Sequence, residues 1–230
     1  AIVEAEAANR VAVLAGLVGA PLYVAHVTCA ETLEQIRAAR QRGQRVYAET
    51  CPQYLLLSVD DYDRPGFEGA KYVLSPPLRS KTNWSALWAA LAEDAVQVVS
   101  TDHCPWDYAT QKTRGRNAFN AIPNGAPGIE TRIPLLFSEG VVKGRLSLER
   151  FVEVCATSPA RLFGLYPQKG VIAVGSDADL VIFDPNERVT LTQARLHQNV
   201  DYCPYEGREV AGYPSTVLLR GEVIVQDGQY

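Results

Sequence analysis

Three polar side chains follow apolar runs that are typical of buried strands. His26 ends the run PLYVAH, Ser75 ends KYVLS, and Asp102 ends VQVVSTD. In folds built from parallel strands and helices, chemistry collects just beyond the carboxyl ends of the strands. A neutral imidazole and a carboxylate at adjoining strand ends suit a metal such as zinc, and the carboxylate can also take up a proton from metal-bound water. We therefore single out His26 and Asp102 as candidate metal ligands.

Each of these three residues also has a purely structural explanation. A single histidine at a strand end is more often a hydrogen-bonded structural group than a ligand. Asp102 would serve equally well to cap a following turn. Ser75 stands before two prolines and would otherwise count as a turn residue. One histidine and one aspartate do not define a metal site by spacing, so the residues alone leave both interpretations open.

The elements that must position these residues alternate between helix and strand. Apolar residues at helical spacing, with glycines as stop signals, predict the first helices. Short runs rich in β-forming residues predict buried strands. The predicted helices cover residues 3–18, 31–42, 84–93 and 146–166, and the predicted strands cover 21–27, 44–50 and 96–102, with a strand-like run at 71–75. This alternation predicts an α/β fold with a parallel sheet.

The pattern changes after about residue 168. The segments KGVIAVGSDADLVIFD and STVLLRGEVIVQDG alternate in polarity and contain Gly and Asp as turn residues, which predicts strands. Pro167 and Gly170 mark a candidate boundary between a domain over residues 1–168 and a β-rich segment over 169–230.

A turn-rich loop, NAFNAIPNGAPGIETR, covers residues 117–132. Clustered Asn-Gly and Pro-Gly turns leave backbone N–H and C=O groups free, and such groups are well suited to an amide-like ligand. An ordinary surface loop is the plainer interpretation of the same pattern.

Composition excludes several classes of function. The net charge is −4, and the sequence has no basic stripe of the kind that binds the phosphates of nucleic acids. No apolar stretch approaches the roughly 18 residues of a membrane span, and the N-terminus does not resemble a signal peptide. Five cysteines without a C-x-x-C pair predict reduced thiols in a cytoplasmic protein. The absence of any Met, even at position 1, predicts a fragment, with Met removal before Ala1 as the rival explanation.

Six segments of the sequence resemble the D-hydantoinases and bacterial dihydropyrimidinases. They occur in that family's order, and the resemblance covers essentially the whole chain. The segments are PLYVAHVTC, AETCPQYLLL, YVLSPPLR, STDHCPW, IPNGAPGIETR and GLYPQKGVIAVGSDADLVIFDP.

The resemblance implies a fold and a set of site residues. The family folds as a (β/α)8 TIM-type barrel with a β-sandwich domain, so this chain would be the C-terminal part of the barrel plus strands of the sandwich. Two metal ions, usually Zn2+, are bridged by a carboxylated lysine and a hydroxide; the other ligands are an H-x-H pair, two histidines and one aspartate. By motif, His26 matches the last histidine ligand, and Asp102 matches the aspartate that is both ligand and catalytic proton shuttle. Ser75 and Asn124 match the positions whose backbone groups bind the cyclic amide or imide.

The resemblance also implies an activity. The family hydrolyses the cyclic amide bond of hydantoins or dihydropyrimidines to N-carbamoyl amino acids. The metals lower the pKa of the bridging water and polarise the carbonyl, and the aspartate passes a proton to the leaving nitrogen. Family members act on small molecules, bind neither nucleic acid nor membrane, and are commonly homotetramers, so we expect a homo-oligomer here.

The chain departs from the family pattern in its ligand set. No H-x-H pair, no bridging lysine context and no second ligand histidine are present. His103 follows Asp102 directly, so along a strand it points to the other face. His197 lies in the β-rich segment and is expected to be structural. Because two of six ligands cannot hold a binuclear centre and half a barrel leaves open sheet edges, we expect this chain alone to be inactive and poorly stable.

Two alternatives compete with this interpretation. The collapsin-response-mediator proteins share the fold, have lost metal ligands and act by interaction; the presence of His26 and Asp102 argues against that class. Allantoinases and dihydroorotases are related hydrolases. STDHCPW followed by IPNGAPGIE favours the hydantoinase and dihydropyrimidinase branch.

Overall fold

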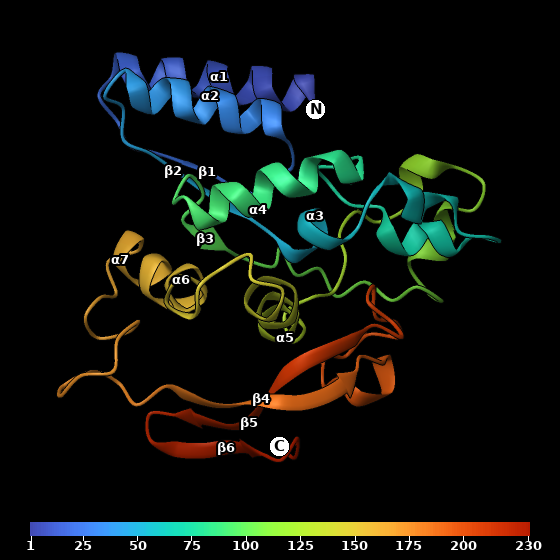
Figure 1. Ribbon diagram of the computed structural model, residues 1–230. Helices are drawn as coiled ribbons and strands as arrows, with labels where there is room; N and C mark the ends of the chain where they lie inside the picture. The colour runs from blue at the N-terminus through green and yellow to red at the C-terminus, as the bar shows by residue number, and fades with distance from the viewer.

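The computed structural model describes all 230 residues and contains two sheets of three strands each (Figure 1). The first sheet is parallel, in the order β1-β2-β3, and consists of β1 (Leu22–Val24), β2 (Val46–Thr50) and β3 (Val98–Val99). The second sheet is antiparallel and consists of β4 (Leu180–Thr190), β5 (Glu209–Leu219) and β6 (Glu222–Gln226). The α/β class and the β-rich character after residue 168 are therefore confirmed.

The helices of the first part follow the predicted periodicity closely. The predictions over 3–18, 31–42 and 84–93 correspond to α1 (Ile2–Leu17), α2 (Ala30–Gln41) and α4 (Trp84–Ala92). A short helix, α3 (Pro52–Leu56), begins directly after β2 with proline in its first turn, where the missing N–H costs nothing. Figure 1 shows α1 and α2 side by side, with β1 and β2 between this pair and α4.

No helix has the length and apolarity that crossing a bilayer requires.

The strands are shorter than predicted, and one strand-like run is not a strand. Residues Glu68–Tyr72 form a 3-10 helix, and Ser75 lies in the loop after it. The expectation that Ser75 ends a strand is therefore wrong. Pro76 and Pro77 cannot donate to a ladder, and the carbonyl of Val73 accepts its hydrogen bonds from Lys112 and Gly125 instead of a strand partner.

The helical region predicted over 146–166 is confirmed with an irregular middle. It contains α6 (Leu148–Val152), a π-helical turn (Glu153–Thr157) and α7 (Ser158–Leu162). Ser147 caps α6 as predicted, because its hydroxyl accepts a hydrogen bond from the Arg150 N–H at 3.1 Å.

Two buried helices were not predicted, α3 and a helix that begins at Arg132. α5 (Arg132–Leu136) continues as a π-helix over Phe137–Val142. Pro134 and Gly140 break the helical pattern in the sequence, yet Leu135 and Leu136 are both fully buried and hold the segment in the core.

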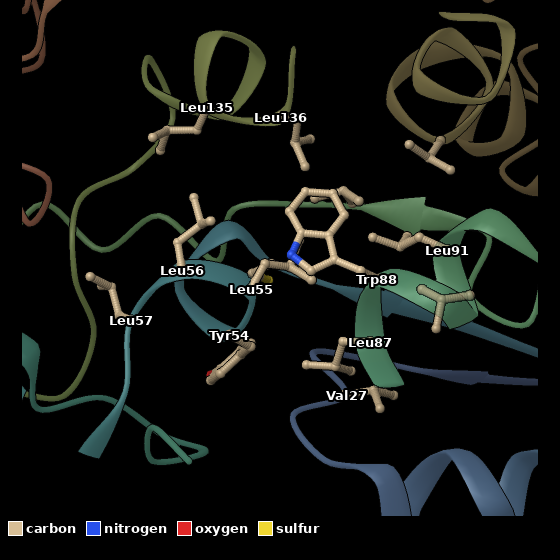
Figure 2. Packing of buried hydrophobic residues seen from close by; sticks show 14 of the residues in the cluster. Val27, Tyr54, Leu55, Leu56, Leu57, Leu87, Trp88, Leu91, Leu135 and Leu136 are labelled. Carbon is tan, nitrogen blue, oxygen red and sulfur yellow. The ribbon is translucent and has the colours of Figure 1, made fainter. Parts of the chain in front are cut away.

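The core is one continuous cluster of 35 buried residues. Figure 2 shows Leu55 from α3, Leu87 and Trp88 from α4, and Leu135 and Leu136 from α5 converging on one another. The same cluster contains buried residues on both sides of the predicted domain boundary, among them Val189, Leu191, Leu196, Cys203, Tyr205 and Val210. The boundary itself stays a prediction, but the two parts share a core.

Truncation of Leu55, which is fully buried, tests this packing. We expect Leu55→Ala to lower the free energy of unfolding by about 2–5 kcal/mol, because the lost contacts leave a cavity. Leu148→Ala is the matched control, since Leu148 is 53% exposed, and a loss within about 0.5 kcal/mol is expected. Urea denaturation of both variants measures the two losses, and equal losses would contradict the assignment of the core.

Candidate active site at the carboxyl ends of the parallel strands

The parallel sheet directs His26 and Asp102 to the same edge. His26 lies two residues beyond the end of β1, and Asp102 lies three residues beyond the end of β3. Because all three strands run in the same direction, their carboxyl ends meet at one edge. The two residues do not follow adjacent strands as we expected, since β2 lies between β1 and β3.

Both residues have a left-handed backbone that is unusual for side chains other than glycine. The φ angle is 39° at His26 and 47° at Asp102. The other three such residues, Asp94, Arg220 and Asp227, lie in turns. A conformation of this kind costs about 1–3 kcal/mol and persists only where the surrounding structure enforces it, which is common at functional sites. The two strand ends therefore store strain at the residues that the sequence singled out.

A third acidic residue, Glu49 near the end of β2, lies beside His26. Its carboxylate accepts a hydrogen bond from the main-chain N–H of His26 at 3.4 Å and another from the Tyr23 hydroxyl at 2.8 Å. Burial and the Glu49 carboxylate together raise the pKa of Tyr23, so this phenol stays protonated and keeps donating. Glu49 thus fixes the backbone turn that carries His26. We did not single out Glu49 from the sequence; in the structure, the alternating burial of β2 places Tyr47 and Glu49 on one half-buried face.

Asp102 and its neighbour His103 have different surroundings. The Asp102 side chain is exposed and makes no hydrogen bond or ion pair with another residue. His103 is occupied structurally, because its Nδ1 accepts hydrogen bonds from the N–H groups of Gly128 at 3.0 Å and Ile129 at 3.3 Å. Burial lowers the pKa of His103, which favours the neutral ring that this acceptor role requires. His103 therefore anchors the turn-rich loop.

His197 also has a structural partner. Its Nδ1 lies 2.8 Å from Oε1 of Glu130, and its main-chain N–H donates to the other oxygen of the same carboxylate at 2.7 Å. The pair connects the β-rich part to the end of the turn-rich loop.

The segments that contain Ser75 and Asn124 lie side by side. The Gly125 N–H donates to the carbonyl of Val73 at 3.0 Å, and the Asn124 carbonyl accepts a hydrogen bond from Trp106 Nε1 at 2.8 Å. Both Ser75 and Asn124 are exposed.

Gly125 brings this loop close to the Asp102 strand end. Its φ is 112°, and a Cβ added there would lie 2.4 Å from Cβ and Sγ of Cys104. Since Cys104 is two residues from Asp102, the two expected substrate-binding segments approach the end of β3.

Lys112 was not identified by the sequence analysis. Its side chain is fully buried, and its Nζ donates to the carbonyls of Val73 at 2.9 Å and Pro123 at 3.0 Å. Burial lowers its pKa to about 8. The sequence QKTRGR around it looks like a solvated surface, so no local signal marks this lysine as buried.

The donor set for a metal is incomplete within this chain. Imidazole and carboxylate are suitable zinc ligands, but a protein site needs at least three. No group of three or more His, Cys, Asp or Glu side chains is arranged to hold a metal ion. Cys51, directly after β2, is fully buried in the core cluster and shares a hydrogen bond with the Ser100 hydroxyl at 3.2 Å, so it adds no exposed ligand at this edge. His26 and Asp102 are therefore suitable types of zinc ligand, but two ligands are too few to form a protein zinc site.

This geometry predicts weak metal binding by the chain alone. After removal of metal with a chelator, addition of equimolar zinc and gel filtration, we expect much less than one zinc per chain by atomic absorption. His26→Ala is expected to leave that value unchanged. One tightly held zinc per chain, lost on His26→Ala, would contradict the incomplete donor set.

Known proteins resemble the chain over nearly its whole length. The model of the amidohydrolase family matches residues 14–224. The chain is 53% identical over 228 residues to a D-hydantoinase from Ralstonia pickettii. It is 47% identical over 228 residues to a D-phenylhydantoinase from Escherichia coli O1:K1 / APEC. Each of these matches includes 99% of this chain. It spans about half the length of these relatives, 50% and 49%.

Solved structures give the same result. A dihydropyrimidinase from Brevibacillus agri NCHU1002 superposes with a TM-score of 0.97 at 51% identity, over 98% of this chain and 49% of that one. An L-hydantoinase from Arthrobacter aurescens superposes with a TM-score of 0.86 at 38% identity, over 97% of this chain and 49% of that one. The resemblance seen in the sequence is confirmed, and the chain belongs to the amidohydrolase family.

Proposed function

We propose that the full-length protein containing this chain hydrolyses the cyclic amide bond of hydantoins or dihydropyrimidines to N-carbamoyl amino acids. The observation that carries the proposal is that His26 and Asp102 both follow strands of one parallel sheet at its carboxyl edge. Gly125 also links the Ser75 and Asn124 segments to Cys104, two residues after Asp102. This arrangement occurs in a chain 53% identical to a D-hydantoinase. Because the chain spans half of that relative, the activity belongs to the full-length protein.

The architecture proposed for the full-length protein is a TIM-type barrel with a small β-sandwich. Residues 1–168 would supply part of the barrel, and residues 169–230 would supply strands of the sandwich. The parallel order β1-β2-β3 with helices between consecutive strands supports the first assignment, and the antiparallel sheet β4-β5-β6 supports the second.

His26 and Asp102 are proposed as two ligands of a zinc centre whose other ligands lie outside this chain. A divalent metal, when bound there, lowers the pKa of water toward neutrality and polarises a carbonyl. The left-handed backbone at both residues supports this role, because the protein holds both against a local energetic preference. The Glu49 carboxylate supports it further by holding the His26 main chain in place.

Asp102 is proposed as the group that moves the proton. Its carboxylate is exposed and makes no hydrogen bond within the chain, so its oxygens are available to accept a proton from the attacking water. The same proton then goes to the ring nitrogen as the C–N bond breaks, and the carboxylate is regenerated.

Ser75 and Asn124 are proposed to hold the substrate through their main-chain groups. A cyclic amide presents alternating N–H and C=O groups, which exposed backbone groups can pair in sequence. The Asn124 carbonyl already accepts one hydrogen bond from Trp106, and its second lone pair remains available for a ring N–H.

The partner proposed for this site is a small cyclic amide or imide, and the proposed assembly is a homo-oligomer, a tetramer by family resemblance. The five cysteines are all unpaired, which supports a reducing compartment such as the cytoplasm.

Substrate preference tests the proposed reaction. The chain is joined to the preceding half of the Ralstonia pickettii D-hydantoinase, loaded with zinc and assayed on hydantoin, dihydrouracil, allantoin and dihydroorotate. We expect turnover of the first two. Turnover mainly of dihydroorotate or allantoin would move the assignment to another branch of the family, and zinc binding without turnover of any of the four would favour a non-catalytic role.

Asp102→Asn tests the proposed proton carrier. In the joined protein we expect kcat to fall by about 10²–10⁴-fold, because the amide cannot accept the proton. Asp107→Asn, in the same loop, is the matched control and should stay within about threefold of wild type, since its carboxylate contacts only Thr110 at 3.4 Å. Steady-state kinetics and zinc content are measured together. An Asp102→Asn protein that keeps wild-type kcat would rule out the role.

A further inference from the structure

Lys112 lies at a junction between the two proposed substrate-binding segments. Its Nζ donates to the carbonyl of Val73, two residues before Ser75, and to the carbonyl of Pro123, directly before Asn124. The Gly125 N–H donates to the same Val73 carbonyl at 3.0 Å. One ammonium group thus connects two loops that have no strand pairing with each other.

The environment of this lysine is unusual. The side chain is fully buried and lies in no ion pair, so two main-chain carbonyls are its only hydrogen-bond partners. A buried ammonium without a carboxylate partner is costly, and it also makes hydrogen bonds that are stronger than those between neutral groups. Cys104 is the other titratable group that influences Lys112, and burial keeps that thiol protonated by raising its pKa.

The packing around Lys112 leaves little freedom for the loops to shift. Gly115, in the 3-10 helix that begins at Lys112 (Lys112–Gly115), has no room for a side chain, because a Cβ there would lie 2.1 Å from Cγ1 of Ile122. On the other side, Gly125 packs against Cys104 in the same way. The separation of the two loops is therefore set by a short, fully buried connection and not by a flexible surface contact.

We propose that Lys112 is a positioning residue that fixes the separation between the Ser75 and Asn124 main-chain groups, and thereby the fit of the cyclic amide. This inference rests on the proposed function. Lys112 has no hydrogen bond or ion pair with His26 or Asp102, so we expect its effect on substrate binding and not on the chemical step.

Lys112→Met tests the proposal, because methionine fills a similar volume without donors. In the joined, zinc-loaded protein we expect KM for dihydrouracil to rise at least about 10-fold, with kcat within about threefold of wild type, the pattern that loss of uniform binding produces. Arg114→Met is the matched control, since Arg114 is an exposed cation in the same 3-10 helix, and both constants should match wild type.

Hydrogen exchange supplies a readout that does not depend on turnover. In Lys112→Met we expect the Gly125 N–H to exchange at least about 10-fold faster, while the Phe151 N–H in α6, remote from the junction, keeps its wild-type rate. Lys112→Gln retains an amide group that can donate hydrogen bonds, so it should disturb folding less than Lys112→Met. We expect it to give intermediate values of both KM and the Gly125 exchange rate.

The outcomes separate the two proposals. An unchanged Gly125 exchange rate in Lys112→Met overturns the positioning role, and so does faster exchange with an unchanged KM. A fall in kcat with constant KM, or faster exchange at Phe151 as well, indicates general destabilisation and also overturns it. Failure of the wild-type joined protein to hydrolyse any cyclic amide is a failure of the proposed function, recorded before any Lys112 variant is compared.

Discussion

The parallel pairing of β1, β2 and β3 is the constraint on which the rest of the site depends. Val24 pairs with Ala48, and Thr50 pairs with Val99, in parallel ladders. The chain therefore leaves all three strands at the same edge of the sheet. His26 and Asp102 come directly after this edge, and both are turned by a left-handed backbone. Without the pairing, an imidazole and a carboxylate 76 residues apart in the sequence would have no reason to share an environment.

The β-rich part contributes to the site by bracing its loops. Asp201 accepts hydrogen bonds from the main-chain N–H groups of Tyr108 at 2.6 Å and Ala109 at 2.8 Å, in the loop that follows Asp102. The Tyr202 hydroxyl donates to the carbonyl of Lys71 at 3.2 Å, just before the Ser75 segment. The two parts are therefore linked by these hydrogen bonds as well as by the shared core, and the antiparallel part holds loops that emerge from the parallel part.

Local patterns in the sequence were enough to predict α1, α2 and α4 and the chain order of the three parallel strands. Helical periodicity over 3–18 and 31–42 depends only on nearby residues, and α1 and α2 agree with it within one residue at each end. Strand pairing is not local. The run before Ser75 has the composition of a strand, yet its Val73 carbonyl accepts hydrogen bonds from Lys112 and Gly125 and not from a neighbouring strand. The burial of Lys112 was not predicted for the same reason. It comes from contacts with loops distant in sequence, and the polar residues next to Lys112 do not indicate it.

His26 and Asp102 are proposed to bind one metal centre at this edge of the sheet. Anomalous scattering at the zinc absorption edge, from crystals of the zinc-loaded joined protein, tests it directly. We expect zinc at about 2.0–2.1 Å from a ring nitrogen of His26 and at about 2.0–2.2 Å from a carboxylate oxygen of Asp102. Zinc bound with neither residue within coordination distance, in a protein that turns over hydantoin, would contradict it.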